Sequence, residues 1–113
     1  MNDGHDRLSA EERYAELVET LARTDGVSLG GQRGFGRGGL TVNGRLFATL
    51  HGSSLLLKLP AEQVALLIAT GRGQMFDAGK GRPMREWVTV AFADGANWIA
   101  LARDALAFVG GGA

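Results

Sequence analysis

The side chains of this sequence that are best able to do chemistry are bases set among glycines and aromatic rings. One cluster is Gly30–Gly39, in which six of the ten residues are glycine, and the other is Ala78–Trp87. Guanidinium and ammonium groups pair with phosphates and carboxylates, and an exposed aromatic ring stacks on a base or a cation. These residue types therefore predict binding of an anionic partner. Together with one lysine between the clusters, the candidate binding residues are Arg33, Arg37, Lys58, Lys80, Arg82, Arg85 and Trp87.

The first cluster contains Gly34–Gly39, which formally matches G-x-G-x-x-G. A dinucleotide site needs a helix directly after this motif, whereas here Leu40–Val42 and a hairpin signal follow, so that site is excluded. Two interpretations remain. The segment is an arginine-glycine stretch that follows phosphates, with Phe35 as a stacking platform, or it is a bulged edge strand in which glycine relieves crowding. A single short block favours the edge strand, because phosphate binding depends on many contacts.

Two interpretations also apply to Ala78–Trp87. If this loop is exposed, its three bases and Trp87 hold a phosphate and stack a base. In the alternative, Trp87 anchors the core, Arg85 pairs with Glu86 or another acid, and the glycines shape a turn. Tryptophan is mostly buried and surface ion pairs are common and weak, so the structural interpretation is favoured.

Residues for catalysis are scarce. The chain has no cysteine and two histidines, His5 and His51, and neither has acids at metal-ligand spacing. Ser53 and Ser54 lie near His51 in a pattern typical of turn hydrogen bonds, not of a nucleophile with its base. We therefore expect no catalytic residue, no metal and no cofactor.

Length and charge set the frame for these candidates. With 113 residues, the chain is expected to form one domain, 1–113, with an ordered core over 9–109 and flexible termini. The formal net charge is zero, yet residues 26–85 hold eight bases against two acids. If the fold gathers these bases, that side attracts phosphate or an acidic partner; if they interleave with acids, they form an ordinary surface.

No apolar run reaches the roughly 18 residues of a membrane span, and the first residues carry acids where a secretion signal carries bases, so we expect a cytoplasmic protein outside the membrane.

The first elements are a helix and a set of hairpins. Ser9 and Glu12 form a capping box that predicts a helix start, and Gly26 is the expected C-terminal cap. Asn43-Gly44 is a strong hairpin signal, because both residues tolerate positive φ. In the segment after this turn, Leu46, Ala48 and Leu50 are expected on one sheet face and Phe47 and Thr49 on the other. The predicted strands are 27–29, 40–42, 45–51 and 54–58.

The second half continues with a helix that enters at Pro60 and stops at Gly71. A loop with a short edge strand at 75–77 leads to a strand over 87–92, and Asp94 is the expected cap of a last helix that ends at Gly110. Apolar stripes on all three helices need a surface to cover. The sequence therefore predicts an α+β fold in two layers, with an antiparallel sheet and the helices on one face.

Glycine, lysine and tryptophan recur in a recognisable order, in Gly44–Ala48, in Leu56–Pro60 and in Gly79–Val90. Over residues 9–109 this order resembles the TfoX N-terminal-like and MmcQ/YjbR-like domains. The resemblance implies the order α-β(3)-α-β(2)-α of secretion-chaperone-like folds. It also implies a link to competence-gene regulation or DNA binding, and it brings no catalytic set.

Three functions are compared. The leading hypothesis is a non-enzymatic binding or regulatory module that docks nucleic acid or an acidic protein through the basic residues. The alternative is a homodimeric protein-interaction module that uses a sheet face or edge, with Phe47, Thr49, Leu56 or Trp87 as the buried patch. An enzyme acting on a small molecule is the least favoured, because no converging acid, base and nucleophile can be named.

Overall fold

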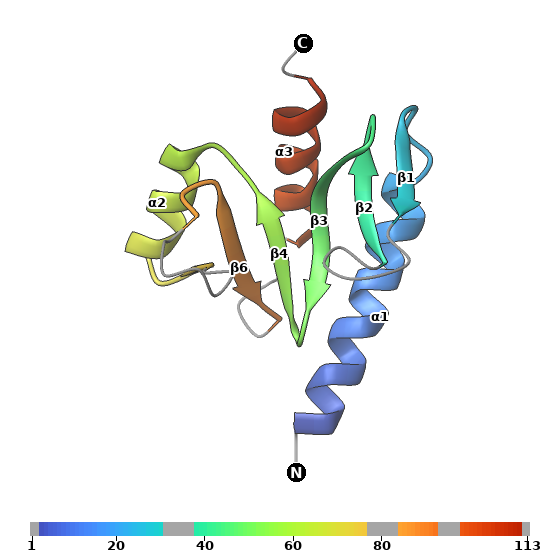
Figure 1. The fold of residues 1–113 in the computed structure, drawn as a ribbon. Coiled ribbons are helices and arrows are strands. Elements are labelled where there is room, and N and C mark those ends of the chain that lie inside the picture. The colour runs from blue at the N-terminus through green and yellow to red at the C-terminus, as the bar shows by residue number, and fades with distance from the viewer. Residues whose placement is uncertain (1–2, 31–37, 77–83, 93–97, 112–113) are drawn as a thin grey trace.

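The computed structural model describes residues 3–30, 38–76, 84–92 and 98–111 (Figure 1). These residues form three helices and six strands, which follow one another in the order α1, β1 to β4, α2, β5, β6, α3. The helices are α1 (Asp3–Leu21), α2 (Ala61–Ala69) and α3 (Trp98–Gly110). The strands are β1 (Val27–Gly30), β2 (Gly39–Val42), β3 (Arg45–His51), β4 (Ser54–Lys58), β5 (Gln74–Met75) and β6 (Trp87–Ala91). Within the residues described, no helix has both the length and the apolar character needed to cross a bilayer.

All six strands belong to one sheet in the order β1-β2-β3-β4-β6-β5, and every neighbouring pair is antiparallel. The sheet forms one layer and the helices form the other, so the predicted two-layer α+β fold is confirmed (Figure 1). Four strands precede α2, one more than the order implied by the family resemblance, because β1 extends the sheet beyond β2.

The hairpin between β2 and β3 follows the sequence signal. Asn43 has φ 53° and Gly44 has φ 85°, so both central residues take the left-handed conformation that a type I′ turn requires. The turn also connects to the next strand pair, because the Asn43 N–H donates to the Gly26 carbonyl at 3.0 Å.

Two helix boundaries differ from the prediction. α1 begins at Asp3, six residues before Ser9, because the preceding residues include no proline and serine inside a helix costs well under about 1 kcal/mol. The helix ends at Leu21, so Gly26 is not its cap; instead Gly26, at φ 86°, forms the turn into β1. The expected cap Asp94 lies outside the described residues, while Pro60 and Gly71 flank α2 and Gly110 ends α3 as predicted.

The alternation predicted for β3 holds in part. Between Leu40 and Thr41 the register with β3 shifts, so that Leu40 pairs with Ala48 but Thr41 pairs with Leu46. Phe47 is the extra residue of this bulge, and it is fully buried in the same apolar core as Ala48. The prediction that Phe47 lies on the sheet face opposite Ala48 was therefore wrong.

The core lies between the sheet and the helices. Leu55 and Leu57 of β4 and Val88 and Val90 of β6 face the helix layer and are buried. From α3, Trp98, Ala102 and Ala105 are fully buried against them, and α1 adds Ala10, Leu17 and Leu21. The end of α3 comes so close to β2 that a Cβ on Gly110 would lie 2.8 Å from Val42 Cγ2.

The core makes a clear prediction for two leucines of opposite exposure. Replacing Leu57, which is fully buried, by alanine leaves a cavity and is expected to lower the free energy of unfolding by about 2–5 kcal/mol. Leu66 is 63% exposed, so Leu66→Ala should change it by less than about 0.5 kcal/mol. Urea denaturation followed by circular dichroism measures both, and equal losses would contradict the core assignment.

Candidate functional site

Within the residues that the structure describes, an apolar groove lies where α2, β5 and the segment before β6 meet. Its volume is about 340 Å³. It is lined by Ala61, Glu62, Val64, Ala65, Ile68, Met75, Met84 and Arg85. Grooves of this size take one or two side chains of a bound peptide or a small molecule. We name this feature the α2 groove.

Local sequence explains how the α2 groove is built. In α2, Val64 and Leu67 turn toward the sheet and are buried, which leaves Ala61 and Ala65 exposed on the neighbouring side. After the helix, Gly71 takes φ 75° and the N–H of Gly73 donates to the Leu67 carbonyl at 3.1 Å.

Gly73 makes the close approach between the helix and the sheet. A Cβ at this position would lie 2.7 Å from Val88 Cγ2 and 3.2 Å from Leu67 Cβ, so only glycine fits. The chain can therefore turn directly into β5, whose Met75 pairs with Val88 and is 55% exposed. This places a flexible methionine on the wall of the groove.

The rim of the α2 groove carries one base and one acid. Arg85 is exposed, and among the residues that the structure describes it has no ion pair. The expected pairing of Arg85 with Glu86 is not found, because the Glu86 carboxylate is directed toward Lys58, with Oε1 4.0 Å from Nζ. Glu62, in the first turn of α2, complements the helix dipole.

Beside this rim, Lys58 and Trp87 pair across β4 and β6. The Lys58 ammonium lies 5.9 Å from the centre of the Trp87 ring, within the range of a cation–π contact. Trp87 is half-buried, and the fully buried tryptophan is Trp98, so Trp87 is not the main anchor of the core. Lys58, Arg85 and Trp87 thus lie on adjoining segments, as the Leu59 N–H donating to the Glu86 carbonyl at 2.9 Å shows. The other predicted residues, Arg33, Arg37, Lys80 and Arg82, lie outside the described residues.

A second hollow is smaller and polar. It has a volume of about 180 Å³ and lies beside the edge strand β5. Ser54, Gly71, Arg72, Gly73, Gln74, Thr89 and Ala91 line it. The backbone N–H groups of Gly71, Arg72 and Gly73 already donate to carbonyls of α2, so they are not available to a ligand.

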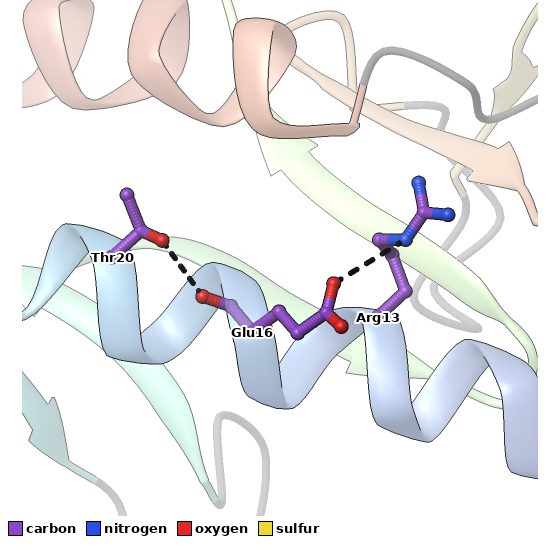
Figure 2. A network of polar contacts seen from close by, with 3 residues as sticks. All are labelled: Arg13, Glu16 and Thr20. Atoms are coloured by element: carbon purple, nitrogen blue, oxygen red, sulfur yellow. Dashed lines mark hydrogen bonds and ion pairs between the residues drawn. The ribbon is translucent and has the colours of Figure 1, made fainter.

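Arg13 on α1 belongs to a local network of polar contacts (Figure 2). Arg13 Nε lies 3.8 Å from Glu16 Oε1, and the Thr20 hydroxyl donates to the Glu16 carbonyl at 3.0 Å. The Arg13 guanidinium also lies 5.7 Å from the centre of the Phe92 ring. These exposed contacts add little stability, and they hold Arg13 on α1, away from Arg85.

Tyr14, also on α1, is a partly buried titratable side chain. Its hydroxyl donates to the Gly38 carbonyl at 2.6 Å, which ties α1 to the entrance of β2. Burial raises the pKa of Tyr14 to about 12, although the hydrogen bond with the Thr49 side chain opposes that shift. A perturbed pKa often marks an active site, but this one has a structural cause and lies outside the groove.

The surroundings of His51 and the placement of possible metal ligands bear on the residues with catalytic potential. His51 ends β3, and its ring lies edge-on to Phe76 with 5.5 Å between the centroids. In the same residues, no group of three or more histidine, aspartate or glutamate side chains is placed to hold a metal ion.

Comparisons with known proteins do not assign this chain to a family. No protein-family model matches it, and searches of curated proteins and of solved structures found no significant match. The resemblance to TfoX-like and YjbR-like domains therefore stays a prediction. Function must be argued from the site itself.

Arg85 was predicted from the sequence as a binding residue, but the apolar side chains beside it were not. The apolar stripe predicted on α2 covers the sheet at Val64, whereas Ile68 is only half-buried. The available signal was Met75 and Met84, two flexible apolar residues on either side of a glycine-rich loop.

The burial of the Tyr14 phenol can be tested directly, because Tyr14 is the sole tyrosine of the chain. Spectrophotometric titration of the phenol should show a midpoint at about pH 12 in the folded protein. In denaturant the midpoint should fall to about 10. The contribution of the buried neutral phenol to the free energy of unfolding is therefore complete below pH 10, and it is lost as the pH rises through 12. In Tyr14→Phe the free energy of unfolding should lose no such contribution between pH 10 and 12. Equal titration midpoints in the folded and unfolded wild-type protein would contradict the burial of the phenol.

Proposed function

We propose that this protein is a non-enzymatic binding module that docks an acidic segment of another protein in the α2 groove. An apolar side chain of the partner enters the groove, and a carboxylate beside it pairs with Arg85. The observation that supports this proposal is an open apolar groove with an exposed arginine on its rim, unpaired among the described residues.

The apolar part of the groove provides the affinity. Ile68, Met75 and Met84 offer hydrocarbon and thioether surface that water covers in the free protein. Burial of apolar surface contributes about 25 cal/mol per Å², so one enclosed side chain is a substantial gain. Methionine adapts its shape to different partners, and two of the groove residues are methionines.

Charge provides the preference for an acidic partner. Residues 26–85 carry eight bases against two acids, and such an excess favours encounter with an acidic segment wherever the fold brings the bases together. Lys58 is already directed toward Glu86 and the Trp87 ring, so Arg85 is the base of this region best placed for a new pair. An arginine binds a carboxylate through two parallel hydrogen bonds, which also fixes the direction of the bound segment.

Nucleic acid is the less favoured partner. A phosphate backbone requires several bases in a row and gains little from an apolar groove. The described residues contribute Lys58 and Arg85 to such a row, and Lys58 shares its charge with Glu86.

The proposal is tested with two synthetic peptides, one with a leucine flanked by aspartates and glutamates, and one in which lysines replace those acids. The acidic peptide should shift the backbone amide NMR signals of Ala65, Met75 and Met84, and the lysine peptide should not. Arg85→Glu should weaken this binding about tenfold, which corresponds to loss of one charged pair. Arg23→Glu, at an exposed arginine just after α1, is the matched control and should leave the affinity unchanged.

Three results would contradict the proposal. Equal binding of both peptides would remove the role of charge, and unchanged affinity in Arg85→Glu would remove the role of this residue. If duplex DNA binds at low salt more tightly than the acidic peptide and shifts the same amide signals, the partner is a nucleic acid.

A further inference from the structure

The outer edge of β1 is a second candidate surface for binding a partner. β1 is the first strand of the sheet, and within the described residues it pairs with a strand on its β2 side alone (Figure 1). An unpaired edge presents a row of backbone donors and acceptors to any other strand. Soluble proteins usually protect such an edge with a lysine, a proline or a covering segment. The residues of β1, Val-Ser-Leu-Gly, include neither a charge nor a proline.

The hydrogen-bond pattern shows which groups are available. Gly26 accepts from Asn43, and the register pairs Ser28 with Thr41 and Gly30 with Gly39, so these residues bond inward to β2. In an antiparallel pair the residues between them direct their backbone groups outward. Val27 uses its N–H on the Thr24 carbonyl at 3.1 Å. The N–H and C=O of Leu29 are therefore the outward pair at the middle of the edge.

The side chain of Leu29 supports the same conclusion. It is 54% exposed, although its neighbour on the same sheet face, Leu40, is fully buried. The apolar row of this face thus continues to the edge and stops in solvent. A strand added at this edge would place a side chain beside Leu29 and extend the row.

We propose that the strand which covers this edge is β1 of a second copy of the chain, paired antiparallel about a two-fold axis at Leu29. Such a pair is self-complementary, because each Leu29 N–H donates to the Leu29 carbonyl of the other copy and the two leucine side chains lie side by side. The sheets of the two copies join into one. β5 at the opposite edge has two residues, too few for a comparable interface.

This surface differs from the dimer patch predicted from the sequence. Phe47 and Leu56 are fully buried and Thr49 is 5% exposed within a single copy, so they are not available to a partner. Trp87, the fourth residue of that patch, is half-buried and lies against Lys58. The sheet edge, the other option in that prediction, is the one that the structure leaves open. The proposal is also independent of the α2 groove, since β1 and β5 lie at opposite ends of the sheet.

Analytical ultracentrifugation of the full chain over a range of concentrations is the first test. The wild-type protein should show reversible self-association, and Leu29→Lys, which places a charge at the centre of the pair, should remove it. Leu66→Lys is the matched control, since Leu66 is an exposed leucine on α2, and it should associate like the wild type. Circular dichroism confirms that each variant is folded. A wild-type protein that stays monomeric, or association that persists in Leu29→Lys, overturns the proposal.

A second test reports the register directly. The chain has no cysteine, so Leu29→Cys introduces a single thiol. In the proposed pair the two Cα atoms at this position lie about 5.5 Å apart, so a short bis-maleimide should cross-link the copies at low reagent concentration. Leu66→Cys should react far more slowly. Equal rates for the two variants would show that the edges do not meet at Leu29.

Discussion

The structure depends on the burial of the central strand β4 from both sides. Leu55 and Leu57 face the helix layer and Leu56 faces the opposite side, and all three are fully buried. β4 also has a paired antiparallel strand on each side, so it lies in the interior of the sheet. β3 and β6 occupy those positions, and the remaining strands are arranged outward from them. Few other arrangements would remove this much apolar surface from water.

The helices follow from that centre. α3 packs closely on β3 and β4 because Ala102 and Ala105 are small, and its last residue, Gly110, allows contact with Val42. α1 lies beside α3 and closes the core with Leu17 and Leu21 (Figure 2). α2 is shorter and turns only Val64 and Leu67 inward, so its other apolar residues remain at the surface. The α2 groove is a consequence of this limited cover.

Both proposed interaction surfaces therefore lie at the margins of the sheet, where the central packing no longer determines the side chains. At the β5 margin, methionines and an arginine surround a groove; at the β1 margin, an uncharged strand ends with an exposed leucine. The formal net charge of zero does not show that an arginine lies at one margin and an uncharged strand at the other. Of the bases predicted to form one binding face, Lys58 is directed toward Glu86, whereas Arg85 lies at the groove with no ion pair among the residues described.

The sequence by itself determined the fold class, the sheet hairpins and most strand boundaries, because these depend on local signals: two-residue periodicity, the positive φ of Asn43-Gly44 and the proline and glycine that flank α2. It misplaced the start of α1 at Ser9, since a capping motif marks one acceptable start and does not prevent an earlier one. The burial of Phe47, Thr49 and Leu56 was decided only by tertiary structure, because a bulge and the cover on each sheet face leave no trace in the alternation. The α2 groove was likewise decided in three dimensions. Its lining comes from three segments, and the volume between them depends on how closely Gly73 lets the chain approach Val88.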